Sequence, residues 1–194
     1  MTIRWKVPLL EGFREVFLYL VIYIYFMKIE NSTIEDLDII FDFYDQAVAF
    51  QKTKFDKHWK GFDIEMIKIE IAENRQFKLI ENNEVVCVFA ITHNDPAIWG
   101  EKDKDSAVYI HRIVTDNRLH GKGFVPFIID WAKTWGKENQ KHFIRLDTWG
   151  DNERLCAYYV KCGFNYVGLM KVTNSETLPA HYNSLSLGLF EIEL

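Results

Sequence analysis

The chain has 194 residues, of which 48% are hydrophobic and 26% charged, a composition typical of a globular protein and not of a disordered one. Its formal net charge of −5 argues against nucleic acid as the main partner, because binding to a phosphate backbone requires a basic face. Cys87, Cys156 and Cys162 form no Cys-x-x-Cys pair, so we expect neither a disulfide framework nor a metal site, and a reducing cytoplasm suits the chain.

The first 26 residues differ from the rest. Basic residues precede an unbroken apolar run over 16–26, which lacks a small-residue cleavage site and is shorter than the roughly 20 residues that cross a bilayer. We therefore expect 1–26 to be an atypical apolar extension that results from a misassigned start, with Met27 as the true start, and 27–194 to be one domain. The alternatives are that the run packs as an additional strand or helix, or that it anchors the chain to a membrane, which we do not expect.

The first half of the domain shows strand, helix, helix and hairpin patterns in that order. Residues 27–30 predict a strand, and Ser32 and Thr33, followed by acidic residues, predict a helix up to about Gln51. A polar loop over 52–61 precedes a second helix expected over 63–74. Residues 77–80 and 85–92 predict two antiparallel strands, and a charged loop over 95–105 leads to a strand over 107–115.

The second half alternates helices and strands. A helix is expected over 122–137, with Pro126 near its first turn, then a strand over 143–147 and a helix over 152–162 that Gly163 ends. The closing strands are expected over 164–172 and 186–193. The resulting order, β-α-α-β-β-β-α-β-α-β-β, combines an antiparallel meander with one βαβ crossover. It predicts an α/β three-layer domain with a mixed sheet.

The junction after residue 115 carries a Gly-x-Gly turn at Gly121 and Gly123. The first N–H groups of the following helix lack partners, and the positive end of its dipole lies behind them, which favours an anion such as a pyrophosphate. Glycines allow the backbone to approach such a ligand. Pro126 replaces the third glycine of a dinucleotide fingerprint, and the other elements of a Walker loop are missing. The alternative is that the turn is only a tight connection.

Two motifs together indicate a family. Arg118-x-x-Gly-x-Gly, followed about thirty residues later by Asn152 and then Tyr159-x-x-x-Gly-Phe, resembles the GNAT superfamily of acetyl-CoA-dependent N-acetyltransferases. The resemblance covers 27–194, element order included. It implies a GNAT-like sheet that is splayed at a cofactor cleft, between the strand ending at Thr115 and the strand ending at Asp147.

The resemblance also implies roles for particular residues. Backbone groups of the first splayed strand would hydrogen-bond the pantetheine arm of acetyl-CoA, N–H groups of the glycine turn would hold its pyrophosphate, and Asn152 would contact the pantetheine or cap its helix. The chain has His120 where the family commonly has Arg or Gln. The residues so assigned to the cofactor are Ile113, Val114, Thr115, Arg118, Leu119, His120, Gly121, Lys122, Gly123, Phe124 and Asn152.

The reaction that the resemblance implies is acetyl transfer to a primary amine of a small molecule or peptide, without a metal. Tyr159 would protonate the leaving thiolate, and His111 is the candidate base; the alternative is that both are ordinary core residues. The acceptor pocket is expected from 52–61, 95–105 and 173–183. The rival function is a non-catalytic acyl-CoA-binding regulatory or interaction domain. The aromatic residues of the last strand and of the helix over 122–137 would suit a homodimer.

Overall fold

The structure is a computed structural model that describes residues 27–119, 121–172 and 185–194. The expected extension over 1–26, His120 and the expected acceptor segment over 173–183 lie outside the described residues. Within the described part, seven strands form one sheet in the order β1-β2-β3-β4-β5-β7-β6. The strands are β1 (Met27–Asn31), β2 (Gln76–Glu81), β3 (Glu84–Thr92), β4 (Ala107–Thr115), β5 (Phe143–Trp149), β6 (Asn165–Lys171) and β7 (Ser186–Glu193).

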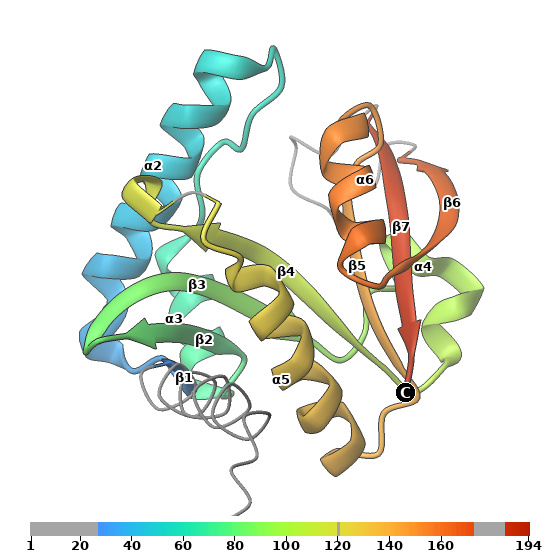
Figure 1. The fold of residues 1–194 in the computed structure, drawn as a ribbon, viewed down its shortest axis with the longest axis horizontal. Helices are drawn as coiled ribbons and strands as arrows, with labels where there is room; N and C mark the ends of the chain where they lie inside the picture. The colour runs from blue at the N-terminus through green and yellow to red at the C-terminus, as the bar shows by residue number, and fades with distance from the viewer. Residues whose placement is uncertain (1–26, 120, 173–184) are drawn as a thin grey trace, which may run out of the picture.

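Helices cover both faces of this sheet (Figure 1). The α-helices are α2 (Leu37–Lys54), α3 (Ile64–Ala72), α4 (Pro96–Trp99), α5 (Phe124–Glu138) and α6 (Glu153–Lys161), and the 3-10 helices are η1 (Ile34–Asp36), η2 (Gly100–Lys104) and η3 (Asn117–Leu119). Figure 1 shows α5 and α6 in front of the strands and α3 behind them. The predicted three-layer α/β domain with a mixed sheet is therefore confirmed.

Each layer buries its own apolar cluster against the sheet. Residues of α5 such as Ile128 pack on the front face, where Ile110 and Leu146 also point. Tyr44 and Ile67, from α2 and α3, pack on the opposite face. The alternation of side chains along each strand explains this division, because successive residues point to opposite faces of a sheet.

Local sequence signals account for most element ends. Asn82 and Asn83, both with positive φ angles of 52° and 66°, form the two-residue turn between β2 and β3, as hairpins of this kind require. The backbone N–H of Thr33 donates to Asp36 Oδ2 over 2.7 Å, so the first helical segment starts with η1. Gly163 ends α6 with a φ of +98°, which a glycine tolerates without steric cost.

Two expectations differ from the structure. The segment over 95–105 is not a loop: the Asp95 carbonyl accepts from the N–H groups of Ile98 and Trp99, and both side chains are buried, so α4 and η2 form there. The helix expected from residue 122 begins at Phe124. Lys122 donates its N–H to the Leu119 carbonyl within the preceding turn, and Gly123 adopts a left-handed φ of +78°.

The parallel strands β4 and β5 separate soon after they start. Their pairing ends at Tyr109 and Arg145, although β5 stays paired with β7 as far as Trp149. Figure 1 shows the two strands diverging from their common end. From Ile110 onward, β4 has no strand partner on that side among the described residues. The splayed sheet is therefore present, and its gap lies where the sequence analysis expected it.

A β-bulge at Arg112 changes which side chains of β4 face the helices. Arg112 has a φ of +51°, and the pairing register of β3 and β4 shifts between Val88 and Ala90. Ile110 packs on the α5 face, whereas the Arg112 side chain reaches Tyr44 of α2 on the other face. The bulge thus directs Arg112 away from the face on which simple alternation from Ile110 would place it.

Candidate functional site

Asp95, His111 and Asp147 meet at the base of the gap between β4 and β5. His111 Nε2 lies 3.6 Å from Asp95 Oδ2, and His111 Nδ1 lies 4.0 Å from Asp147 Oδ1. The three side chains are only 19%, 10% and 6% exposed, in the order His111, Asp95, Asp147. Asp95 Oδ2 and His111 Nε2 are both buried and have no hydrogen-bond partner within the described part of the chain. A buried unpaired polar atom is costly, so these atoms mark a place for a polar ligand.

Burial changes the protonation of this group, which we name the Asp-His-Asp cluster. It raises the pKa of Asp147 to about 7, and it raises the pKa of Asp95 to about 7 with the help of the negative charges of Asp147 and Asp103. Burial, with the positive charges of Arg112 and Arg75, lowers the pKa of His111 to about 3. The cluster therefore combines a neutral imidazole with two carboxyl groups that gain and lose protons near neutral pH.

The two arginines near the cluster are committed to other carboxylates. The Arg112 guanidinium forms an ion pair with Glu70 and donates to the Tyr44 hydroxyl over 3.2 Å. Arg75 pairs with Glu73 over 2.6 Å and lies 3.8 Å from Glu70. The contacts of Arg112 connect β4 to α2 and α3. Because both arginines are engaged in this way, the carboxyl groups of the Asp-His-Asp cluster have no direct cationic partner among the described residues.

Tyr159 of α6, the predicted general acid, is anchored by aromatic packing. Its ring lies 6.0 Å from Phe164 and 5.7 Å from Phe190, measured between ring centres. Burial raises the pKa of its hydroxyl, and the negative charge of Asp147 acts in the same direction. The hydroxyl therefore remains protonated at physiological pH and is influenced by the Asp-His-Asp cluster.

The glycine turn precedes α5, as predicted, and its glycines are open to a ligand. Gly121 and Gly123 have φ angles of +86° and +78°, and a Cβ atom added at either would meet nothing within 4 Å. Gly123 is the N-cap of α5, and no side chain caps the helix there. The first N–H groups of α5 are therefore available to an anion.

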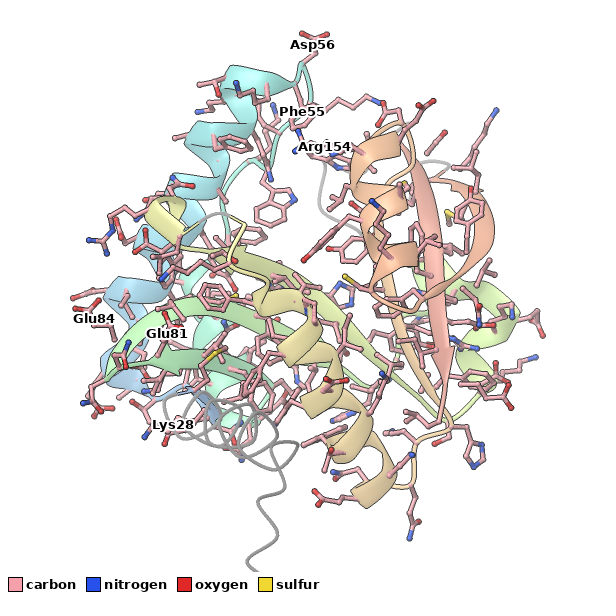
Figure 2. The ribbon with its side chains drawn as sticks, in the orientation of Figure 1. Lys28, Phe55, Asp56, Glu81, Glu84 and Arg154 are labelled. Carbon is pink, nitrogen blue, oxygen red and sulfur yellow. The ribbon has the colours of Figure 1, made fainter. Side chains whose placement is uncertain are left out.

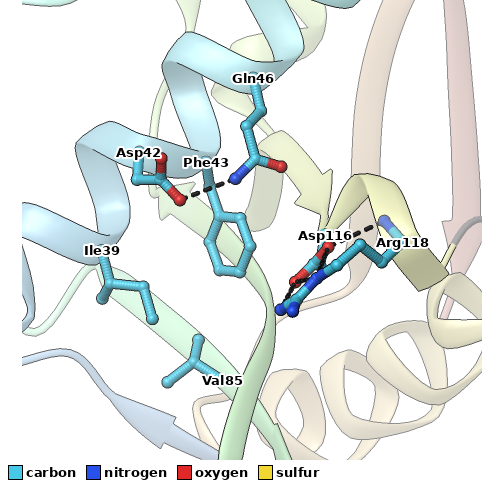
Figure 3. A pocket seen from close by; sticks show the side chains of 7 residues that line it. All are labelled: Ile39, Asp42, Phe43, Gln46, Val85, Asp116 and Arg118. Atoms are coloured by element: carbon cyan, nitrogen blue, oxygen red, sulfur yellow. Dashed lines mark hydrogen bonds and ion pairs between the residues drawn. The ribbon is translucent and has the colours of Figure 1, made fainter.

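Other N–H groups of the same turn are already used. Arg118 donates its N–H to Asp116 Oδ1 over 2.8 Å, and Leu119 donates to the Asp116 carbonyl over 2.9 Å. The Arg118 guanidinium also pairs with the Asp116 carboxylate over 2.6 Å. Figure 3 shows this pair beside a pocket of about 400 Å³ on the α2 side. The residues that line the pocket are Ile39, Asp42, Phe43, Gln46, Val85, Asp116 and Arg118.

The remaining predicted cofactor residues are divided between the edge of the gap, the core and the surface. Ile113 and Thr115 belong to the part of β4 without a partner strand on the β5 side, whereas Val114 is buried against α2 and α3. Phe124 is buried in the core, and Lys122 Nζ lies 3.5 Å from Glu81. Asn152 is the N-cap of α6 and accepts the Leu155 N–H over 3.2 Å, which confirms the predicted cap.

The segment after α2 reaches across the open end of the gap to β5. The Phe55 and Trp149 rings meet edge to face with 5.5 Å between their centres, and Lys57 Nζ lies 2.9 Å from Asp151 Oδ2. Figure 2 shows Phe55 at this end of the molecule, with Arg154 of α6 nearby in the view. These two contacts form a bridge over the gap on the side of the predicted 52–61 acceptor loop.

Sequence reasoning identified His111 but missed its two carboxylate partners. Asp147 appeared only as a strand end and Asp95 only as part of a charged loop, because the three residues are far apart in the chain. One usable signal was Asp147, the single acidic residue in a strand that also contains four apolar residues. Such a residue is rarely buried without a functional or structural reason.

Comparisons with known proteins agree with this architecture. The sequence profile of the Acetyltransferase (GNAT) family matches residues 38–164. The N-acetyltransferase YesJ of Bacillus subtilis is 26% identical in an alignment 160 residues long, which covers 73% of this chain and 89% of YesJ.

Two solved structures have the same fold. A GNAT-family acetyltransferase from Listeria monocytogenes has a TM-score of 0.69 and 23% identity, and the match covers 87% of this chain and 95% of that one. The acetyltransferase YncA from Salmonella typhimurium, solved with acetyl-CoA, has a TM-score of 0.62 and 14% identity over 86% of this chain and 93% of that one.

Proposed function

The chain belongs to the GNAT family of acetyltransferases, and from that premise we propose that it transfers the acetyl group of acetyl-CoA to a primary amine of a small molecule or peptide. The observation that carries the proposal is the gap between β4 and β5, with the glycine turn at one border and the Asp-His-Asp cluster at its base, where the charge of Asp147 helps to raise the pKa of Tyr159. No helix in the described part of the chain is long and apolar enough to cross a membrane.

The described residues fit acetyl-CoA. An anion at the α5 N-terminus would meet the helix dipole and the N–H groups that follow Gly123, and the open space at both glycines admits a pyrophosphate. The unpartnered edge of β4 at Ile113 and Thr115 would hydrogen-bond the pantetheine arm as an added strand does. Since Arg118 and Leu119 donate their N–H groups to Asp116, we place the pyrophosphate nearer to the start of α5.

The proposed reaction is a direct attack of the neutral amine on the thioester carbonyl. The C–N bond forms as the carbonyl becomes a tetrahedral oxyanion, which backbone N–H groups of the β4 edge would stabilise. Collapse breaks the C–S bond, the Tyr159 hydroxyl donates a proton to the sulfur, and the nitrogen loses its second proton to the resulting phenolate. The amine must first lose a proton, and His111, the expected base, is a weak one because its pKa is low.

Calorimetric titration with acetyl-CoA and with free CoA tests the cofactor assignment. We expect micromolar binding that Gly121→Glu abolishes, since the new carboxylate would occupy the open space and repel the pyrophosphate. Gly61→Glu is the matched control, because Gly61 also has a positive φ and open surroundings but lies in the segment before α3. Equal affinity of the Gly121→Glu variant, or no binding by the folded native chain, would contradict the assignment.

A thiol-release assay with a panel of primary amines tests turnover. Release of CoA that depends on the amine, with a product heavier by one acetyl group, is the expected result. Binding of acetyl-CoA without turnover of any amine would instead support the non-catalytic acyl-CoA-binding domain.

A further inference from the structure

We propose that Asp95, His111 and Asp147 bind the ammonium group of the acceptor, that Asp147 takes its proton, and that this cluster selects amines without a carboxylate next to the nitrogen. The inference rests on the proposed function, since it specifies the acceptor and the base of that reaction. It assigns a role to two carboxylates that the sequence motifs do not include.

The geometry of the imidazole favours an ammonium ligand. One carboxylate lies near each of its two nitrogens, Asp95 at Nε2 and Asp147 at Nδ1. A neutral imidazole has one N–H and one acceptor nitrogen, so its N–H can face one carboxylate while its acceptor nitrogen receives an N–H of the ligand. A single metal ion could use only one ring nitrogen, whereas an ammonium group with three N–H donors can reach several of these oxygens.

The balance of charge around the cluster favours a cationic ligand. The charged or titratable side chains that surround it come from every neighbouring element: Asp103 from η2, Arg112 from β4, Arg75 before β2 and Tyr159 from α6. Both arginines are paired with Glu70 or Glu73, and Tyr159 is neutral. When they are ionised, the two buried carboxyl groups thus lack a cation of their own among the described residues, and an alkylammonium group would supply it.

The same balance explains the proposed selectivity. A carboxylate on the carbon that bears the amine would lie close to Asp95 and Asp147, and like charges in a poorly solvated site repel strongly. The described residues around the cluster offer no unpaired guanidinium or ammonium to receive it, because Arg112 and Arg75 are engaged. We therefore expect simple alkylamines to be accepted and α-amino acids to be rejected at their α-amine.

The proton transfer is balanced within the cluster. The N–H bond of the ammonium breaks, its electron pair stays on nitrogen, and the proton forms an O–H bond with Asp147, so an ammonium and a carboxylate become a neutral amine and a carboxylic acid. Burial keeps the pKa of Asp147 near 7, so the carboxyl group can accept this proton and later release it to solvent. His111 and Asp95 are positioning residues in this step.

The first experiment measures binding in the presence of free CoA, with pentylamine and norleucine as probes. Norleucine is pentylamine with a carboxylate on the carbon that bears the amine, so the pair isolates that group. By calorimetry, we expect the native chain to bind pentylamine at least tenfold more tightly than norleucine, and Asp147→Asn to lose this binding. Asp130→Asn, on the exposed face of α5, is the control and should behave as the native chain does.

The second experiment separates the roles of the two carboxylates by acetyl-transfer kinetics. We expect Asp147→Asn, which also loses an ammonium contact, to lower kcat about 100-fold, the usual scale for a lost general base, with the affinity for acetyl-CoA within threefold of native. Asp95→Asn should mainly raise the KM for the amine, about tenfold, because one ammonium contact is lost. Unchanged circular dichroism spectra of the folded variants would show that the effects are local.

The outcomes distinguish this inference from the proposed function. If Asp147→Asn retains kcat within threefold, or if norleucine is bound or acetylated as well as pentylamine, the inference is overturned and acetyl transfer stands. If the native chain binds acetyl-CoA but acetylates no amine, the proposed function fails, and the binding of pentylamine then decides the inference alone. Loss of that binding in Asp147→Asn would support the ammonium site, and absence of binding to the native chain would refute it.

Discussion

The guanidinium group of Arg145 is stacked over the indole ring of Trp99, with its Cζ atom 4.7 Å from the ring centre. The Arg145 side chain is fully buried, and it forms ion pairs with Asp105 and Glu191. It also donates to the Lys102 carbonyl. Arg145 of β5 thus contacts both α4 and η2 and fixes them against the sheet. Asp95 is positioned with them, because its backbone N–H donates to the Asp103 carboxylate in η2.

Replacing Arg145 by methionine is therefore expected to destabilise the fold. The variant keeps most of the apolar volume but leaves the partly buried Glu191 carboxylate with Lys102, 3.6 Å away, as its remaining ion-pair partner, and it removes the stacking on Trp99. We expect the free energy of unfolding to fall by about 3 kcal/mol, measured by urea titration. Lys133→Met, which breaks an exposed pair, should change it by no more than about 0.5 kcal/mol. Equal stability of the two variants would contradict the anchoring role.

Replacing Tyr159 by phenylalanine should separate its chemistry from its packing. The phenyl ring can keep the contacts with Phe164 and Phe190, so we expect the midpoint of thermal unfolding and the affinity for acetyl-CoA to stay close to native. Loss of the proton donor should lower kcat by about 100-fold, measured by thiol release. Tyr158→Phe on the same helix is the control. If both variants lose the same activity, Tyr159 is not the general acid.

The Asp147 carboxyl also predicts a pH dependence of stability. Its pKa is about 7 in the folded chain and about 4 when unfolded, so between these values only the folded state holds the proton. Its contribution to stability is fully present below pH 4 and is lost as the pH rises through 7. Asparagine cannot ionise, so Asp147→Asn does not lose this contribution as the pH rises. Its free energy of unfolding should therefore increase relative to that of the native chain by about 1 kcal/mol for each pH unit between pH 4 and 7.

Urea unfolding of both proteins at pH 5, 6, 7 and 8 measures this difference. The comparison with the variant is needed because His111 has the opposite effect on the pH dependence of stability. Its pKa is lowered in the folded chain, so its contribution to the free energy of unfolding is lost as the pH falls. Asp130→Asn should show a difference from native that does not vary with pH. A constant difference for Asp147→Asn as well would mean that its carboxyl is not held protonated by burial.

The contact between Phe55 and Trp149 should affect binding of the acceptor amine and not binding of acetyl-CoA. Trp149→Ala removes the edge-to-face contact that joins the segment after α2 to β5. We expect the KM for the amine to rise about tenfold, while the calorimetric affinity for acetyl-CoA changes less than threefold. Lys57→Met, which removes the more exposed ion pair with Asp151, should have a smaller effect. An equal rise in the dissociation constant of acetyl-CoA would place the bridge at the cofactor instead.

Much of the fold could be predicted from the sequence because its signals are local. Apolar spacing, Asn152 as a helix cap, the antiparallel strand pair over 77–80 and 85–92 and the glycine turn before α5 each act within a few residues, and the structure has these features where they were expected. The short helix α4 was missed, because four residues are too few for a periodic pattern to be visible.

The candidate site required the tertiary structure for a different reason. Asp95, His111 and Asp147 belong to three separate segments, and they meet only because β4 and β5 start as a parallel pair and then diverge. Burial of Arg145 in β5 likewise depends on partners distant in the chain. The sequence by itself thus determined the family, the order of elements and the glycine turn. Packing alone decided which carboxyl groups are buried, and a pKa depends on that burial and on the neighbouring charges.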